Sequence, residues 1–193
     1  MNGTLLRTLA LFSLIAGACF AVAENPEQGP HKPSQSAADA LREATGADVA
    51  FLPAGMVRNL DSVQDLAQIL QYPTDLVGVI KISGSQVRQA LERSVSLLPL
   101  GSSSFLQLSG LEATYSKSAP AEKRIISVMV GSSKLDDSKD YRIAMPMALA
   151  RGGLGYFKVW KSDQIEKTAE QSLESILSGK KVTLTSDRWI ATP

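Results

Sequence analysis

The chain has 193 residues, of which 44% are hydrophobic and 20% charged, and its formal net charge is +1. This length and composition predict one ordinary globular domain with a sizeable core. The near-neutral charge excludes the basic surface of a nucleic-acid-binding protein and an acidic block for a cationic partner. We therefore expect no nucleic-acid partner.

The first 23 residues are typical of a secretory signal peptide. Arg7 supplies the positive charge, residues 9–20 form a short apolar run, and Ala21, Val22 and Ala23 make a small-x-small cleavage site. The run is shorter than the about 20 residues of a membrane-spanning helix. We expect cleavage after Ala23 and a periplasmic or secreted mature protein without a transmembrane segment. A lipoprotein anchored at Cys19 is the alternative.

The chain has few residues that could carry chemistry. Cys19 is the only cysteine and His31 the only histidine. Zinc and di-metal hydrolase sites use several histidines with carboxylates, and a serine nucleophile needs a base. The acidic group at residues 136–140 lacks the ligand spacing of a calcium loop and is typical of a solvated turn. We expect no metal, no cofactor and no catalytic residue.

After the signal peptide, residues 24–35 are polar and contain three prolines. Such a segment buries little apolar area, which predicts a flexible lead-in with His31 as a solvated side chain. The globular domain is expected over residues 36–193.

Hydrophobic periodicity and turn residues predict the elements of this domain. Helices are expected from Ser36 to Gly46, over 62–70 with Asp61 or Ser62 as N-cap, from 83–85 to about Leu98, and around 170–177. Strands are expected at 49–52, 76–82, 111–115, 124–130, 141–145 and near 182–184. Helices and strands do not alternate regularly, so the predicted fold class is α+β, a single domain with a mixed β-sheet and flanking helices.

Two glycine-containing segments could bind a ligand. Residues 45–58, TGADVAFLPAGMVR, combine a helix end, a buried strand and a loop that presents Arg58, which could clamp a phosphate or carboxylate. Residues 150–157, ARGGLGYF, would let the backbone approach a flat ligand, on which Tyr156 could stack. Tight packing of the glycines and a core position for the aromatic ring are the structural alternatives.

Five segments in order resemble the C-terminal domain of the 5′-nucleotidase family: ADALREATGADVAFL, LVGVIKISGSQVRQALE, FLQLSGLEATY, VMVGSSKLDDSKDYRIA and ARGGLGY. The resemblance spans about residues 36–184. In that family an N-terminal metallophosphatase domain carries the metals, and the C-terminal domain stacks the base of a nucleotide between two aromatic rings. The resemblance implies a nucleotide or nucleoside ligand, with Gly55, Arg58, Gly152, Gly153 and Tyr156 as its contacts.

Most recognition residues of the family are replaced, although Arg58 is kept. This chain has Pro53 for an asparagine, Met56 for a glycine, Leu108 and Ala148 for the two aromatic residues, and Leu154 for an aspartate. Each lost stacking ring removes about 1–3 kcal/mol of binding. We expect a retained scaffold with weak or lost nucleotide binding in the manner of the family.

A chain of this length has no room for a metallophosphatase domain. The leading hypothesis is therefore an exported, stand-alone, non-catalytic binding module linked to nucleotide catabolism. The alternative is a recognition subunit that complements a separate exported metallophosphatase in trans. A third hypothesis is a structural protein of the envelope that contacts other envelope proteins.

Overall fold

A computed structural model describes residues 25–183 and 186–193, so the expected signal peptide lies outside the described residues. The helices are α1 (Lys32–Thr45), α2 (Gly84–Val95), α3 (Met147–Ala150) and α4 (Leu173–Leu177), and the 3₁₀ turns are η1 (Ala54–Met56), η2 (Leu66–Ile69), η3 (Gly153–Lys158) and η4 (Ser162–Gln164). The strands are β1 (Val49–Pro53), β2 (Leu76–Ser83), β3 (Leu106–Ser109), β4 (Leu111–Ser116), β5 (Ile125–Val130), β6 (Ser133–Lys134), β7 (Asp140–Pro146), β8 (Ile165–Ser172) and β9 (Trp189–Thr192).

These strands form two mixed sheets. The larger sheet has the order β3-β1-β7-β2-β8, with β1 and β7 parallel. The smaller sheet has the order β6-β5-β4-β9, with β4 and β9 parallel. The remaining pairings are antiparallel. The predicted α+β class is confirmed, although the strands divide between two sheets instead of forming one.

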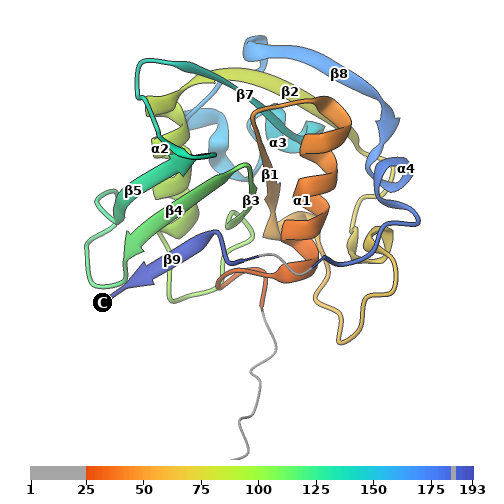
Figure 1. Cartoon of the computed structure of the whole chain (residues 1–193), viewed down its shortest axis with the longest axis horizontal. Helices are drawn as coiled ribbons and strands as arrows, with labels where there is room; N and C mark the ends of the chain where they lie inside the picture. Colours follow the sequence, from red (N-terminus) through yellow and green to blue (C-terminus); the bar gives the residue numbers. More distant parts are fainter. Residues whose placement is uncertain (1–24, 184–185) are drawn as a thin grey trace, which may run out of the picture.

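The larger sheet is buried on both faces along β3, β1 and most of β7 and β2, whereas the edge strand β8 is largely exposed. Along β1, Val49 and Phe51 belong to one hydrophobic cluster, and Ala50 and Leu52 belong to another. The first cluster includes side chains of α2 and the smaller sheet, and the second includes side chains of α1 and α4. Figure 1 shows this arrangement, with β4, β5 and β9 on one side of β1 and with α1 and α4 on the other. Double burial explains why β1 and most of β2 are nearly continuous apolar runs.

The prediction of a flexible lead-in is wrong for residues 25–35, because the buried side chain of Gln107 holds this segment on the domain. Gln107 Nε2 donates to the carbonyl oxygens of Pro26 and Gly29, at 3.0 and 2.8 Å. Its Oε1 accepts from the amide of His31 at 3.0 Å. His31 is 3% exposed and not a solvated tail residue. Polar residues are ordered here because a buried amide needs partners.

Helix α1 begins at Lys32, four residues before the predicted start at Ser36. Pro33 lies in the first turn, where a residue without an N–H costs no helical hydrogen bond. The helix ends as predicted at Gly46, whose φ of 63° is left-handed. In α2, Ser83 caps the helix in a capping box with Gln86, as the Ser-Gly-Ser sequence indicated.

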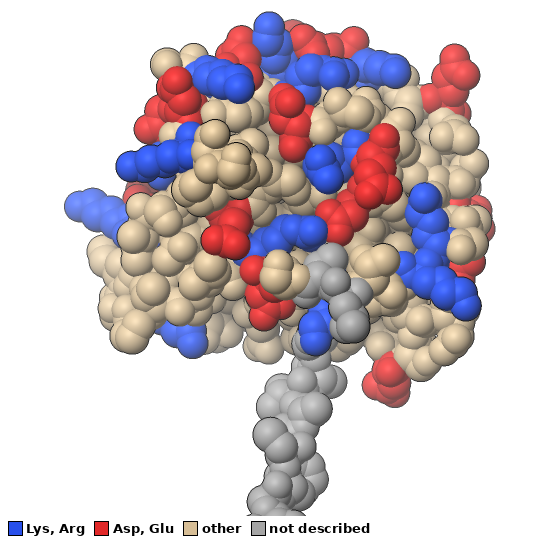
Figure 2. Space-filling model, in the orientation of Figure 1, with Lys and Arg blue, Asp and Glu red and all other residues tan. Residues whose placement is uncertain are grey.

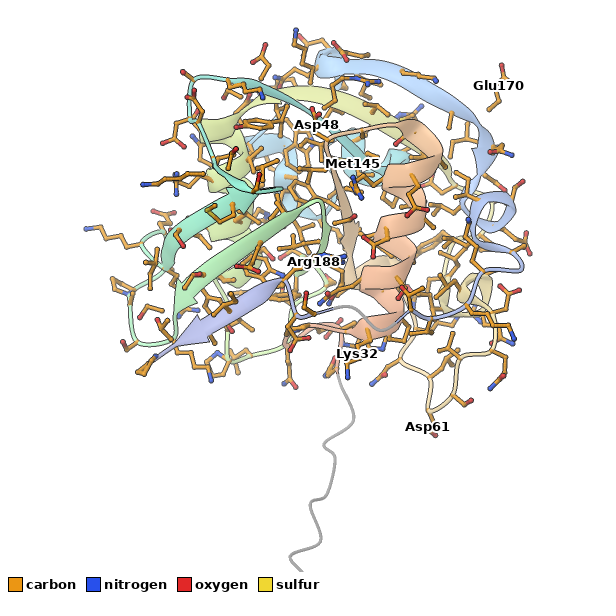
Figure 3. The ribbon with its side chains drawn as sticks, in the orientation of Figure 1. Lys32, Asp48, Asp61, Met145, Glu170 and Arg188 are labelled. Carbon is orange, nitrogen blue, oxygen red and sulfur yellow. The ribbon has the colours of Figure 1, made fainter. Side chains whose placement is uncertain are left out.

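The helix predicted over residues 62–70 is instead the short turn η2, capped by Asp65 and not by Asp61 or Ser62. Two backbone bonds, one from Arg58 to Ile69 and one from Gln71 to Met56, close the intervening segment into a loop. Figure 3 shows Asp61 at the outer end of this loop. The apolar residues of the segment face the core without forming a regular helix.

The C-terminal region also differs from the prediction. Residues 165–172 form strand β8, which was not predicted, so only Leu173–Leu177 remain helical in the segment expected to be a helix. Residues 182 and 183 are not a strand, and residue 184 lies outside the described residues. The last strand is β9. Arg188, directly before β9, lies beside α1 (Figure 3) and pairs with Asp39 at 2.9 Å, each side chain being 19% exposed.

Two fully buried glutamines give the first prediction. Gln107 makes three hydrogen bonds, whereas neither amide atom of Gln35 in α1 has a partner among residues 25–183 and 186–193. A buried polar group without a partner costs about 1–3 kcal/mol. We expect Gln35→Met to raise the free energy of unfolding by about 1 kcal/mol or more, measured by urea denaturation.

Gln107→Met is the matched control, since it makes the same exchange at a satisfied amide. It should lower the free energy of unfolding by about 1–3 kcal/mol. A loss of stability in Gln35→Met would show that this side chain has a partner in solution.

Candidate binding cleft

Three loops, of which two follow strands and one leads into a strand, surround a cleft of about 580 Å³. The lining residues are Pro53, Gly55, Met56, Tyr72, Thr74, Asp75, Ala148, Leu149, Gly153 and Leu154. This volume lies within the range of small-molecule sites, which are mostly apolar with a few polar groups. We refer to it below as the cleft.

The first wall is the turn η1, directly after β1. Its backbone is tied to the segment before β3, because Ala54 donates to the Phe105 carbonyl and Gly55 to the Ser103 carbonyl, both at 2.8 Å. A Cβ at Gly55 would lie 2.9 Å from the Cβ of Ser103, so this close approach requires glycine.

The second wall consists of residues 72–75, directly before β2. Tyr72 is 56% exposed. Asp75 orders the wall, because its Oδ1 accepts from the amide of Leu76 at 3.0 Å and its Oδ2 from the amide of Ala148 at 3.2 Å. The second of these bonds joins the wall to α3. The carboxylate is thus anchored at the cleft by backbone donors.

The third wall runs from α3 into η3 and contains the glycine loop, residues 152–155. Gly152, Leu154 and Gly155 have φ values of 88°, 55° and 80°, all in the left-handed region. A Cβ at Gly153 would lie 2.6 Å from the carbonyl oxygen of Ala148. Leu154 is 37% exposed and lines the cleft. The glycines therefore fold the loop tightly onto α3.

Tyr156 lies behind the cleft. Its side chain is fully buried, and its ring stacks on Trp160 with centroids 4.8 Å apart. Its hydroxyl donates to the carbonyl oxygen of Ser104 at 2.7 Å. Burial raises the pKa of this hydroxyl far above its ordinary value of 10, against a smaller opposing effect of the charge on Arg93. The hydroxyl therefore remains a donor that joins the third wall to the segment behind the first.

The structure brings together two of the five predicted ligand contacts. Gly55 and Gly153 line the cleft, from different walls. Gly152 is buried beside Gly153, with Phe157 where a Cβ would lie. Arg58 is exposed and is not among the lining residues. The buried ring of Tyr156 is not positioned to stack on a ligand, so its role is structural.

Four of the five positions at which the resemblance implies a replaced family residue do line the cleft: Pro53, Met56, Ala148 and Leu154. The fifth, Leu108, is fully buried in β3 and belongs to the core. An aromatic residue there would not face the cleft. The aromatic lining residue is Tyr72, which the sequence analysis missed along with Thr74 and Asp75. Its signal was a Tyr-Pro-Thr-Asp turn directly before a buried strand, since sites gather at strand ends.

Within residues 25–183 and 186–193, no group of three or more His, Cys, Asp or Glu side chains is placed to hold a metal ion.

Removing the Tyr156 hydroxyl gives the second prediction. Tyr156→Phe leaves the ring in place but leaves the Ser104 carbonyl without this donor, so we expect a loss of about 1–3 kcal/mol in the free energy of unfolding. Tyr72→Phe is the matched control at an exposed hydroxyl and should change stability by less than about 0.5 kcal/mol. Urea denaturation of both variants measures the difference, and equal effects would contradict it.

Tyr156→Phe should also change how the free energy of unfolding depends on pH. The pKa of Tyr156 is raised in the folded protein. Its contribution to the free energy of unfolding is therefore complete below pH 10. That contribution is lost as the pH rises further, because Tyr156 then ionises in the unfolded chain. The wild-type protein should therefore lose more stability above pH 10 than Tyr156→Phe does. Tyr115, whose pKa burial also raises, keeps the variant from becoming independent of pH.

Comparison with known proteins identifies the domain. The sequence profile of the 5′-nucleotidase C-terminal domain matches residues 18–162. A 5′-nucleotidase-related protein of Glossina morsitans morsitans is 33% identical, over 58% of this chain and 22% of its own length. A snake venom 5′-nucleotidase of Naja atra is 34% identical, over 50% of this chain and 20% of its own length. The chain thus spans about a fifth of these relatives.

Solved structures show the same fold. A 5′-nucleotidase precursor from Thermus thermophilus aligns with a TM-score of 0.70 at 22% identity, over 88% of this chain and 37% of its own. The NAD nucleotidase of Haemophilus influenzae aligns with a TM-score of 0.66 at 20% identity, over 88% of this chain and 36% of its own. With the family profile matching most of its length, the chain belongs to the 5′-nucleotidase C-terminal domain family.

Proposed function

We propose that this domain is an exported, non-catalytic binding module that takes a nucleoside or nucleotide in the cleft. The observation that carries the proposal is that the two loops bearing the family's recognition motifs, after β1 and after β7, form two walls of one cleft. A volume of about 580 Å³ suits a ligand of this size.

The lining divides between surfaces for a ring and groups for its polar edge. Met56, Leu149 and Leu154 provide apolar contacts. Tyr72 offers the face of an aromatic ring, on which a base can stack. Thr74 and Asp75 supply a hydroxyl and a carboxylate that can accept hydrogen bonds from a ribose or base. One ring in place of two favours weaker binding than a sandwich between two aromatic rings.

The five residues that the family resemblance implies as ligand contacts have distinct roles in this proposal. Gly55 and Gly153 contact the ligand through their backbones, while Gly152 and Tyr156 hold the third wall in place. Arg58 lies beyond the lining and would meet an anionic group that extends out of the cleft. On the face shown in Figure 2, positive and negative side chains are interspersed, so this face carries no continuous basic stripe for a polyanion.

Export is proposed from the N-terminal sequence, which combines Arg7, the apolar run 9–20 and the small residues 21–23. Within the described residues, the structure contains no helix long and apolar enough to cross a membrane. The N-terminus of the protein recovered from its cells tests the proposal. A protein beginning at residue 24 supports a cleaved signal peptide, one beginning at a lipid-modified Cys19 supports a lipoprotein, and an intact N-terminus contradicts export.

A second candidate is recognition in trans, in which the domain complements a separate exported metallophosphatase. The exposed apolar side chains favour it, since Tyr72 and Phe157 are 56% exposed and Leu154 is 37% exposed in or near the cleft. Such surfaces mark partner contacts. Co-purification with an exported metallophosphatase, lost in Phe157→Glu, would support this candidate. Failure of the two to associate would remove it.

Ligand binding gives the third prediction. We expect adenosine to bind saturably in a calorimetric titration with EDTA present, and Tyr72→Ala to weaken binding by about 1–3 kcal/mol because a stacking face is removed. Phe157→Ala is the matched control, since Phe157 has the same exposed fraction but does not line the cleft. It should leave binding unchanged.

Two results would contradict the proposed function. One is no binding of adenosine and AMP by the wild-type protein. The other is metal-dependent release of phosphate from AMP by the purified protein, which would show that the chain is itself catalytic.

A further inference from the structure

Arg93, in the last turn of α2, reaches the glycine loop from outside the cleft. It lines a separate hollow on the surface together with Arg88, Gln89 and Lys158. From there its Nε donates to the carbonyl oxygen of Leu154 at 3.1 Å, and its Nη2 donates to the same oxygen. Leu154 in turn lines the cleft. A single guanidinium therefore binds the backbone of a cleft residue from behind.

The glycine loop needs such a partner because its backbone conformation is unfavourable. Leu154 has φ 55° and ψ 24°, a conformation that costs free energy for a residue with a Cβ. It lies between two residues, Gly153 and Gly155, that restrict the chain little. A charge-assisted hydrogen bond to the Leu154 carbonyl opposes relaxation of the loop to an ordinary conformation.

The loop is shaped to receive the guanidinium. A Cβ at Gly155 would overlap Nη2 of Arg93, so only glycine leaves room for the side chain at this position. The guanidinium carbon also lies 5.2 Å from the centroid of the Tyr156 ring, within the range of a cation–π contact. Arg93 thus contacts three successive residues, 154–156.

These contacts continue to the opposite wall of the cleft. The Tyr156 hydroxyl binds the Ser104 carbonyl, and the neighbouring Ser103 carbonyl accepts from the amide of Gly55. Arg93, Tyr156 and residues 103–104 therefore form one chain of contacts between α2 and η1. The position of Leu154 relative to Gly55 depends on this chain.

We propose that Arg93 is a positioning residue for the cleft: it holds the glycine loop so that Leu154 stays where a ligand contacts it. This inference rests on the proposed function for its effect on binding, but not for its effect on the loop. Lysine cannot replace it fully, because an ammonium group lacks the planar fork that presents two donors to one oxygen.

Hydrogen exchange of backbone amides, followed by mass spectrometry, tests the effect on the loop without any ligand. Arg93→Met keeps much of the aliphatic stem and removes the donors. We expect exchange in peptides covering residues 152–157 to become about tenfold faster, the effect of losing one charge-assisted hydrogen bond. Exchange in β1 and β7 should not change. Arg88→Met is the matched control, since Arg88 lies on the same helix but pairs with Asp137, and it should leave the loop unchanged.

Adenosine titration of the same variants tests the effect on the cleft. Arg93→Met should weaken adenosine binding by roughly tenfold, Arg93→Lys should weaken it less, and Arg88→Met should not weaken it. Arg93→Lys also serves if Arg93→Met does not fold.

The outcomes separate the two proposals. Unchanged exchange in residues 152–157 would overturn the positioning role, and so would faster exchange spread equally over β1 and β7, which would indicate general destabilisation. Faster exchange confined to the loop, in a protein that binds no adenosine even as wild type, would support the positioning role and contradict the proposed function.

Discussion

Burial of both faces of the central strands of the larger sheet is the constraint on which the rest of the structure depends. Side chains of a strand alternate between faces, so β1 contributes to two cores through consecutive residues. Each core then needs its own cover, which α2 and the smaller sheet supply on one face and α1 and α4 on the other. With both faces covered, the ends of the strands remain open to solvent, and the loops of the cleft lie there.

Buried polar groups decide how the chain ends attach to this core. Gln107 binds the segment before α1 through three hydrogen bonds. Arg188 binds Asp39 of α1, and Trp189 donates from its indole to the carbonyl oxygen of Leu106 at 2.8 Å. The segment before α1 and the beginning of β9 are therefore both held by β3. A polar or irregular sequence can be well ordered when its hydrogen bonds satisfy buried groups of the core.

The frame of the cleft and its lining are constrained differently. The glycines that permit close contacts between loops are present, and the buried Tyr156 still joins opposite walls through Ser104. The positions that line the cleft carry Pro53, Met56, Ala148 and Leu154. Frame residues are constrained by packing against many neighbours, whereas lining residues contact few protein atoms and can change without loss of the fold.

The sequence by itself determined the α+β class and the buried strands at 49–52 and 76–82. It also determined the C-terminal end of α1 at Gly46 and the N-terminal end of α2 at Ser83. Each of these depends on local signals, which are a left-handed glycine, a capping hydroxyl and a continuous apolar run. The family resemblance also located two walls of the cleft. These features could be predicted because residues that are neighbours in the sequence decide them.

Only the tertiary structure decided the remaining features. Polar β8 and the short β9 pair with distant strands, and the segment before α1 is ordered by Gln107, which lies more than 70 residues away. The same holds for the site. Tyr156 is buried in the core, where it contacts Trp160, Arg93 of α2 and the Ser104 carbonyl. Tyr72 lines the cleft because the 58–71 loop returns to η1. Whether an aromatic ring contacts the core or a ligand depends on residues that are distant in sequence, and a local sequence pattern cannot identify those residues.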